Sequence, residues 1–455
     1  ICAIIFPLIT FPYVSRTLGV DAYGEVNFSN SIVSYISLIA GLGVSSYAIR
    51  EGARIREKKD EFEKFSNEVF SINVSATFAA YIILTILLLM WGKLQSYRTL
   101  VIILSINVLL TTLGTDWINT IYEDFGYLTI RYIVCQSIAV VTTLLLVKKP
   151  EDVVLYAIFS NLGTILANTL NIFYIRKKLN IHLKFTFKMN IAKHFQPIML
   201  LFGNMISSMI YLYSDTTMLG VMVGDAAVGY YTVSSKIYSL IKQLINAVSN
   251  VLIPRLSHDL ENDIENKTTG NVNAVLGILT VIVFPIAVGI ICMGKEIIYF
   301  IAGQEYVLAY PALAILSIAL IFSTYACIFV SVIMLAQRMD REILFASGVS
   351  AFVNIALNAV LIPKYSYNAA AFTTLISEFI ILILGIYYTR KVITVSIGKY
   401  ILLAAMGVIE VFLICFATKH FIQNKILTLI LSVIICGIVY GTTIGIAFFT
   451  KKNTG

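Results

Sequence analysis

Long apolar runs follow one another along the whole chain and are separated by short polar segments. Fourteen runs are long enough to cross a bilayer, since a helix spanning the hydrocarbon core needs about 20 mostly apolar residues. They lack the alternation of apolar and polar positions that marks the strands of a membrane barrel. We therefore expect an all-α membrane protein with about 14 transmembrane helices. The runs lie at residues 1–18, 24–49, 66–91, 99–122, 126–147, 152–175, 197–222, 227–252, 271–294, 309–336, 343–362, 368–390, 398–417 and 425–449.

The composition also indicates a membrane protein. Of the 455 residues, 58% are hydrophobic and 13% are charged, and the mean hydropathy is +0.87. A soluble chain of this length needs more charge to cover its surface, whereas in lipid the backbone forms its hydrogen bonds within helices. The six cysteines lie inside apolar runs without a CxxC pair. We interpret them as small buried residues and expect neither disulfides nor a metal site.

The distribution of basic residues predicts the orientation. If the N-terminus is cytoplasmic, 21 of the 33 Lys and Arg residues fall in inside loops and nine in outside loops. This excess follows the positive-inside rule, so we expect both termini to be cytoplasmic. Basic loops that face an anionic lipid leaflet explain the net charge of +8, which therefore requires no nucleic acid partner.

The chain contains an internal repeat at a shift of 205 residues, with seven identities in 32 positions. Each copy has a short outer turn bounded by glycine, a serine-rich span and an arginine at the cytoplasmic exit. Six spans separate the copies, so both enter the membrane in the same direction. Parallel repeats of this kind are a transporter design with the substrate between the halves. The pairs are Gly19 and Gly224, Ala22 and Ala227, Gly24 and Gly229, Ser29 and Ser234, Ile32 and Ile237, Ser34 and Ser239, and Arg50 and Arg255.

The repeat divides the chain into predicted domains. Residues 1–175 form a first six-helix bundle and residues 197–391 a second one, related by a parallel pseudo-two-fold repeat. A basic cytoplasmic linker at 176–196 joins them. Residues 392–455 add two further helices and a short cytoplasmic tail.

Charged residues inside spans are candidates for a transport site, because each is costly in lipid unless it faces a cavity or a partner. Lys236 and Lys242 lie near the middle of the span at 227–252. Their spacing makes them point about 120° apart on a helix, so both need not line one cavity. A cavity-lining role and a structural ion pair remain open for each lysine.

Three further residues complete the predicted substrate-binding cavity. Arg16 ends the first span, where it either lines the cavity or anchors the helix at the headgroups. Asp215 lies deep in the span at 197–222 and either pairs with a lysine or binds a cation. Arg131 either contacts the substrate or forms a helix-packing salt bridge to Glu123 or Asp124.

Three carboxylates inside spans are candidates for coupling transport to protons or sodium ions. They are Asp116, Glu378 and Glu410. Glu410 belongs to the two additional helices, where a packing or lipid-contact role competes with ion coupling.

The signals expected of an enzyme fail. The stretch from Gly289 to Glu296 matches a phosphate-binding P-loop until its last position, where Glu296 replaces the hydroxyl residue that holds magnesium. The four histidines, which we place in loops, form no metal-binding pattern. We predict that the protein is not an enzyme and uses no metal or cofactor. The histidines are His182, His194, His258 and His420.

Four groups of residues have the spacing of a known family. They are Phe11 to Gly19 with Tyr23-Gly24; Asp116-Trp117 with Glu123 and Ile130-Arg131; Asp215 with Met218 to Gly220 and Val228 to Tyr231; and Pro363 to Tyr365 with Ala369 to Ala371 and Ser377-Glu378. Over essentially the whole chain, the sequence resembles the polysaccharide-biosynthesis flippases. These are the O-antigen and capsule transporters of the multidrug/oligosaccharidyl-lipid/polysaccharide exporter superfamily. One departure is Ser366-Tyr367-Asn368, where the family usually has glycine in the turn.

The resemblance implies two six-helix bundles, a central cationic cavity and alternating access. It further implies an undecaprenyl-diphosphate-linked oligosaccharide as substrate, moved from the cytoplasmic to the outer leaflet of a bacterial inner membrane. Polymerase and other polysaccharide-assembly proteins are the implied partners. The chemistry agrees, because lysine and arginine hold a diphosphate by charge-assisted hydrogen bonds. The alternative is a cation-coupled multidrug antiporter of the same superfamily, which mid-span lysines disfavour.

Overall fold

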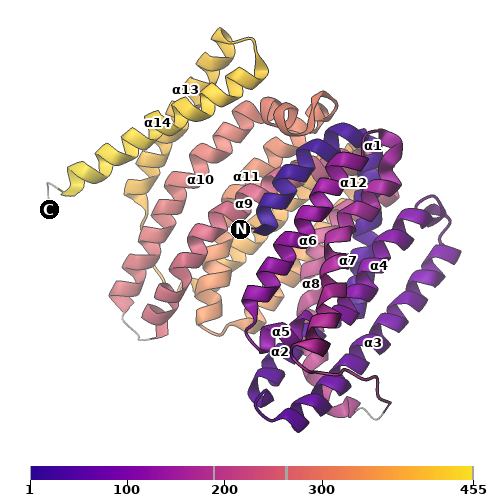
Figure 1. Ribbon diagram of the computed structural model, residues 1–455. Helices are drawn as coiled ribbons and strands as arrows, with labels where there is room; N and C mark the ends of the chain where they lie inside the picture. Colours follow the sequence, from indigo (N-terminus) through magenta and orange to yellow (C-terminus); the bar gives the residue numbers. More distant parts are fainter. Residues whose placement is uncertain (1, 188–189, 262–264, 453–455) are drawn as a thin grey trace. The chain divides into compact units, whose positions relative to one another are not determined.

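The computed structural model describes residues 2–187, 190–261 and 265–452. Helices make up nearly all of these residues, and no strand forms among them (Figure 1). Nine helical segments in the described part of the chain are long and apolar enough to cross a membrane. The expected all-α membrane fold is therefore confirmed. Residues 188–189 of the predicted linker and 453–455 of the predicted tail lie outside the described residues.

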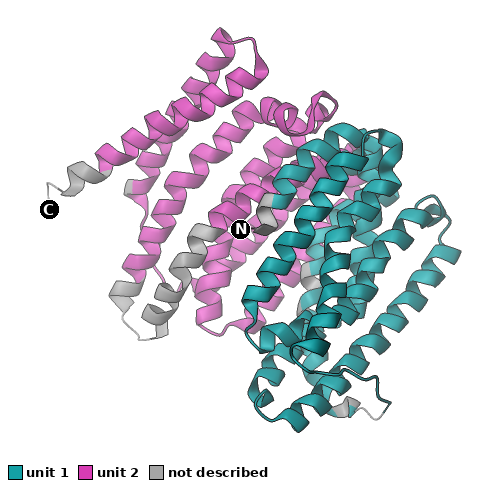
Figure 2. Ribbon diagram, viewed as in Figure 1, with its two compact units in different colours: residues 1–229 teal, residues 230–455 magenta. Residues whose placement is uncertain are grey.

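The helices pack into two compact units, residues 1–229 and 230–455 (Figure 2). The boundary falls inside α9 (Asp225–Glu261), after α8 (Ile191–Met222), because α8 packs against α1 (Cys2–Gly41) in the first unit. The predicted division at 176–196 rests on the sequence repeat rather than on packing, and it stays a prediction.

The first unit follows the expected spans. Its remaining elements are α2 (Val44–Ile55), α3 (Lys59–Met90), η1 (Gly92–Gln95), α4 (Arg98–Gly114), α5 (Asp116–Ile121), α6 (Phe125–Leu146), η2 (Pro150–Asp152) and α7 (Val153–Lys177).

Helix α1 contains two expected spans in one run. Gly19 has φ 74° and ψ −178°, a conformation that glycine adopts at little cost, so the helix bends there without a loop. The second half of α1 ends at Gly41, earlier than expected, because Leu42 and Gly43 both have positive φ. The chain resumes as the separate helix α2.

The expected span at 99–122 is broken in two. Thr115 has φ 48° and ψ 45°, a left-handed conformation that ends α4 and lets α5 begin at Asp116. A Cβ on Gly114 would lie 2.5 Å from the Asn168 side chain, so glycine allows α4 and α7 to approach closely at the break. The short helix α5 packs against α2, α6 and α7.

The second unit has a strained bend in its longest helix. Helix α12 merges two expected spans and bends at Ser366, which has φ 54° and ψ −138°. Serine stands where glycine is usual in the resembling family, so the turn forms with a strained backbone. After α9, the elements are α10 (Glu265–Ala302), η3 (Gln304–Ala309), α11 (Tyr310–Ala326), the π-helical turn η4 (Cys327–Met334), α12 (Asp340–Thr389), α13 (Gly398–Phe421) and α14 (Lys425–Lys452).

The surface and interior are those of a helical protein that faces lipid. Leu89 and Met90 on α3 are 69% and 81% exposed, whereas Ser29 and Ser31 on α1 are fully buried. The Ser31 hydroxyl donates to the carbonyl of Phe28 in the preceding turn, which satisfies its hydrogen bond inside the helix. Small polar residues therefore allow α1 to pack closely while large apolar residues point outward.

Candidate substrate and ion-coupling sites

A buried ion pair joins α9 and α12 in the second unit. The Lys242 Nζ lies 2.6 Å from Oε1 of Glu378, and the Tyr238 hydroxyl donates to the same oxygen at 2.8 Å. The Glu378 side chain is only 4% exposed, whereas that of Lys242 is 26% exposed. Tyr238 precedes Lys242 by one helical turn and so faces the same side of α9. We call Lys242, Glu378 and Tyr238 the second-unit charge centre.

Irregular helix geometry lies beside this charge centre. The π-helical turn η4 packs against α12, the helix that carries Glu378, and its first residue, Cys327, lies near Lys242 and Glu378. π-helical turns inside longer helices are frequent at functional sites. The charge centre therefore lies where the helix geometry departs from the regular α-helix.

A second charged cluster lies in the first unit, where α4 breaks. Nη2 of Arg131 on α6 lies 2.7 Å from Oδ2 of Asp116, and Nδ2 of Asn171 on α7 donates to the other carboxylate oxygen at 2.9 Å. The Arg131 side chain is 5% exposed and the Asp116 side chain 48% exposed. The guanidinium also stands over the Tyr127 ring at 5.4 Å. We call Arg131, Asp116 and Asn171 the first-unit charge centre.

Donors at the first-unit charge centre lack partners. Nε and Nη1 of Arg131 make no hydrogen bond among the described residues, and neither does the Nδ2 of Asn119. Buried donors without partners are costly, so this cluster favours an additional acceptor such as water or an anionic group. Arg131 therefore holds Asp116 through one nitrogen, while its other two nitrogens are buried without a partner among the described residues.

The partners expected for Arg131 are wrong. Glu123 pairs with Arg56 at 2.7 Å, and its hydrogen bond and charge raise the pKa of the Arg56 guanidinium. Asp124 accepts a hydrogen bond from the Tyr174 hydroxyl. Both acids lie before the start of α6, whereas Arg131 lies more than a turn inside this helix. At that level the neighbouring acid is Asp116, the first residue of α5 after the break that follows α4.

The other predicted cavity residues are spread over several helices. Arg16 is exposed on α1, Asp215 is 5% exposed on α8, and Lys236 is partly buried on α9. Their role in a cavity stays a prediction. Glu410 on α13 accepts a hydrogen bond from the Thr443 hydroxyl of α14 at 2.8 Å. This contact between the two additional helices is of the packing kind that competes with ion coupling as the role of Glu410.

One buried histidine was misplaced by the sequence reasoning. His194 lies in the first turn of α8 rather than in a loop, and it is fully buried. Its Nε2 lies 2.8 Å from a Glu68 oxygen and its Nδ1 lies 2.7 Å from the Tyr47 hydroxyl. Both ring nitrogens are thus satisfied, and the triad ties α2, α3 and α8 together. His258 and His420 also belong to helices, α9 and α13, and not to loops as expected.

Polar residues without charge were missed as well. Asn354, Asn358 and Thr373 form a buried cluster between the two halves of α12, with Thr373 donating to Asn358 at 2.6 Å. The spacing of Asn354 and Asn358, one turn apart in an apolar span, was the available signal. The P-loop-like stretch lies wholly inside α10, and its Glu296 pairs with Lys419 at 3.0 Å.

Two repeat-related glycines meet in the first unit. A Cβ on Gly24 would lie 1.9 Å from the Asp225 carbonyl oxygen, and one on Gly229 would lie 2.3 Å from the Val20 carbonyl oxygen. The shift of 205 residues that relates the two glycines also relates Val20 to Asp225. Each glycine therefore faces the repeat equivalent of the residue that the other glycine faces, as expected for a two-fold repeat. It brings α1 and the start of α9 to backbone contact.

These features define a class of protein. The long apolar helices, the parallel repeat and the ionisable residues buried within spans belong to a multi-pass membrane transporter. The chain belongs to the polysaccharide biosynthesis protein family, whose sequence model matches residues 1–260. The protein is accordingly a transporter and not an enzyme.

Relatives agree with this family. The chain is 24% identical over 308 residues to a protein of Shigella dysenteriae named as an O-antigen transporter, covering 67% of this chain and 76% of that one. An Escherichia coli K12 protein of the same name is 21% identical over 398 residues, covering 85% and 93%. A Haloferax volcanii protein named as flippase AglR is 30% identical over 172 residues, covering 37% and 36%.

Solved structures share the fold. The lipid II flippase MurJ, in an inward closed conformation, superposes with a TM-score of 0.77 at 19% identity, over 99% of this chain and 96% of that one. An inward-facing multidrug transporter of the MATE family superposes with a TM-score of 0.67 at 15% identity, over 86% and 94%. Likeness at these identities establishes the fold.

Proposed function

We propose that the protein carries a polyprenyl-diphosphate-linked oligosaccharide from the cytoplasmic to the outer leaflet by alternating access, for cell-surface polysaccharide synthesis. Relatives named as O-antigen transporters and the fold of a lipid II flippase support this substrate class. An anion leaving a negative cytoplasm gains about 2.3 kcal/mol per charge per 100 mV from the membrane potential, which favours the outward direction.

The observation that carries the proposal is the second-unit charge centre. Its lysine is the more exposed partner and its glutamate the more buried one. A diphosphate that reaches Lys242 can replace Glu378 as the acceptor of its charge-assisted hydrogen bonds. The lysine then holds the cargo, and the diphosphate neutralises the lysine charge in place of Glu378.

The same exchange supplies a route to ion coupling. A buried carboxylate that has lost its cationic partner costs several kcal/mol. Binding of a proton or sodium ion at Glu378 removes that cost, so cargo on Lys242 and a cation on Glu378 favour each other. The first-unit charge centre offers a related arrangement, since Asp116 is half exposed and Arg131 has free donors.

Complementation tests the proposal. In a strain that lacks its lipid-linked oligosaccharide flippase and is supplied with the matching glycan, we expect the wild-type chain to restore surface polysaccharide. Lys242→Ala, Glu378→Gln and Lys236→Ala should lose most of this activity at equal expression. Lys364→Ala removes the same charge from an exposed residue near the Ser366 bend and should retain it.

Two outcomes would contradict the proposal. Full complementation by Lys242→Ala would remove the charge centre from transport. Cation-dependent export of a cationic drug by the purified protein, without movement of the lipid-linked glycan, would instead establish the multidrug antiporter.

A further inference from the structure

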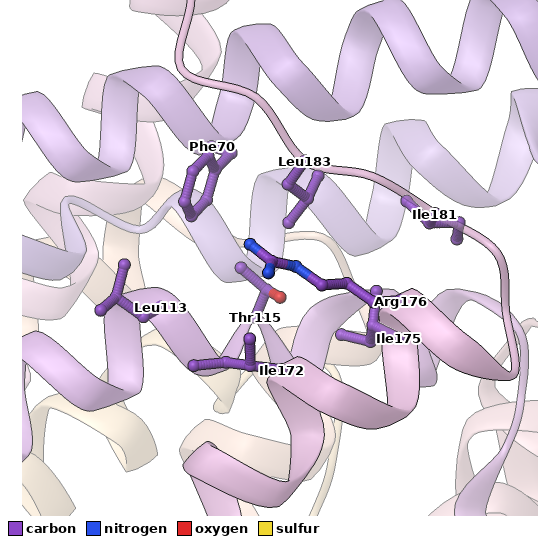
Figure 3. Close-up of a pocket in the computed structure, with 8 residues that line it drawn as sticks. All are labelled: Phe70, Leu113, Thr115, Ile172, Ile175, Arg176, Ile181 and Leu183. Atoms are coloured by element: carbon purple, nitrogen blue, oxygen red, sulfur yellow. The ribbon is translucent and has the colours of Figure 1, made fainter.

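A small cavity lies at the predicted cytoplasmic end of the first unit, beneath the segment that leads from α7 to α8. Its volume is about 160 Å³. It is lined by Phe70 of α3, by Leu113 and Thr115 at the break after α4, and by Ile172 of α7 (Figure 3).

The segment at 179–187 forms a strap over this cavity. The backbone N–H of Lys184 donates to the Asn67 side chain at 2.7 Å, and that of Thr186 donates to the Ser71 hydroxyl at 2.8 Å. These bonds attach the strap to α3. Ile181 and Leu183 of the strap point their apolar side chains into the cavity (Figure 3).

A guanidinium enters this largely apolar space. Arg176 lies in the last turn of α7, and its head extends towards Thr115 and Phe70 in the middle of the cavity (Figure 3). Arg176 as a whole is exposed to solvent, and among the described residues no carboxylate lines the cavity around its head. A guanidinium in a cavity that holds no carboxylate can bind an anionic acceptor through two parallel hydrogen bonds.

The surroundings distinguish which anion fits. The walls are apolar apart from Thr115 and Arg176, which suits a phosphate that carries hydrocarbon rather than a fully hydrated ion. Lys177, Lys178 and Lys184 stand next to the cavity in sequence, and basic groups at this end of the spans attract an anionic leaflet. The volume accommodates one phosphoryl group with the first atoms of its ester.

We propose that this cavity binds the phosphate of an anionic phospholipid of the inner leaflet, with Arg176 as its principal ligand and the Thr115 hydroxyl as a second donor. The bound lipid joins the strap to α3 and α7 and so stabilises the connection into α8. This site is separate from the charge centres proposed for cargo, and its test requires no transport.

Thermal unfolding of the purified, delipidated full chain tests the site. We expect phosphatidylglycerol to raise the unfolding temperature of the wild-type chain, with a smaller effect from zwitterionic phosphatidylcholine and none from inorganic phosphate. Arg176→Gln should lose most of the phosphatidylglycerol shift. Lys177→Gln, which removes the same charge from the neighbouring residue that does not line the cavity, should keep it.

Leu183→Trp gives an independent variant, because it fills the cavity while leaving Arg176 in place. It should lose the phosphatidylglycerol shift as well, even if Arg176→Gln does not fold. An unchanged shift in either variant would overturn the proposal. A full shift from inorganic phosphate alone would also overturn it, since the occupant would then be a free ion and not a lipid.

Discussion

At the scale of single residues, the ion pair between Lys242 and Glu378 links stability to transport. Neither partner is buried alone, because the tyrosine hydroxyl and the ammonium both donate to one carboxylate oxygen. Removing one partner of a buried pair costs about 3–5 kcal/mol, whereas replacing both with apolar residues is often neutral. Stability and transport can thus be separated by mutation.

We predict that Lys242→Met lowers the unfolding temperature clearly and that Lys242→Met with Glu378→Leu restores most of it. Transport should be lost in both, because neither variant retains the charge that holds the cargo. Thermal unfolding in detergent and complementation at equal expression measure the two effects. A double variant that transports normally would contradict a role for the pair beyond packing.

Ser366 provides a prediction about strain. Its φ of 54° with ψ of −138° lies in a region that is nearly restricted to glycine and costs about 1–3 kcal/mol for other residues. Ser366→Gly should therefore stabilise the chain by about 1 kcal/mol, after the greater freedom of glycine in the unfolded state is subtracted. Thermal unfolding checks this. Ser366→Ala, which keeps the strain, is the control and should not stabilise.

The charged residues could be found from the sequence, but most of their partners could not. Buried charge is visible because lysine, arginine and carboxylates stand out in apolar spans. Pairing depends on how helices far apart in sequence are rotated, which explains why Arg131 pairs with Asp116 and not with the expected Glu123 or Asp124. Uncharged partners such as Tyr238 and Asn171 carry little signal in the sequence.

At the scale of helices, the glycine contact between α1 and α9 fixes how closely two elements cross. Gly24 and Gly229 each face a backbone carbonyl, which cannot move aside as a side chain can. Alternating access requires repeat-related helices to separate at one end while they meet at the other. We expect this close contact to limit how far α1 and the start of α9 can separate.

We predict that Gly24→Ala and Gly229→Ala each hold the outer end apart and reduce transport several-fold. An added methyl group would lie 1.9 Å and 2.3 Å from the carbonyl oxygens. Gly41→Ala, which meets no atom within 4 Å, is the matched control and should transport normally. Because the two glycines share one contact, the double variant should lose less than the two single losses combined. Additive losses would contradict a shared contact.

Helix existence was predicted well from the apolar runs, but helix ends were not. The turns at Gly19 and Ser366 contain so few residues that the expected pairs of spans merge into α1 and α12. Thr115 divides an expected span, and the only glycine at the break, Gly114, does not by itself signal the end of a helix. Such breaks depend on packing against neighbouring helices, here the contact of Gly114 with Asn168.

At the scale of the whole molecule, the orientation is a prediction that follows from the loop charges. In a variant without native cysteines, Lys391→Cys should react with a membrane-impermeant maleimide only after the cells are permeabilised. Lys364→Cys, on the opposite side of one span, should react in intact cells. The reverse labelling would overturn the assignment of cytoplasmic termini.

The fold and the family were within reach of the sequence, because apolar runs and turn motifs are spread over the chain. The strap cavity at Arg176 was not, since Phe70, Thr115 and Leu183 come together only after folding. The glycan is not encoded by any single motif, because sugar contacts are distributed over many helices. Direct transport is therefore the decisive property of the whole molecule.

The central claim is best tested with purified protein in liposomes that contain a polyprenyl-diphosphate-linked oligosaccharide, probed by a glycan-cleaving enzyme that cannot cross the membrane. We expect wild-type protein to make the inner-leaflet glycan accessible with time, so that nearly all of it is cleaved. Liposomes with Lys242→Met protein should release only the outer-leaflet share. If wild-type liposomes also stop at that share, as protein-free liposomes do, the protein does not move this class of lipid.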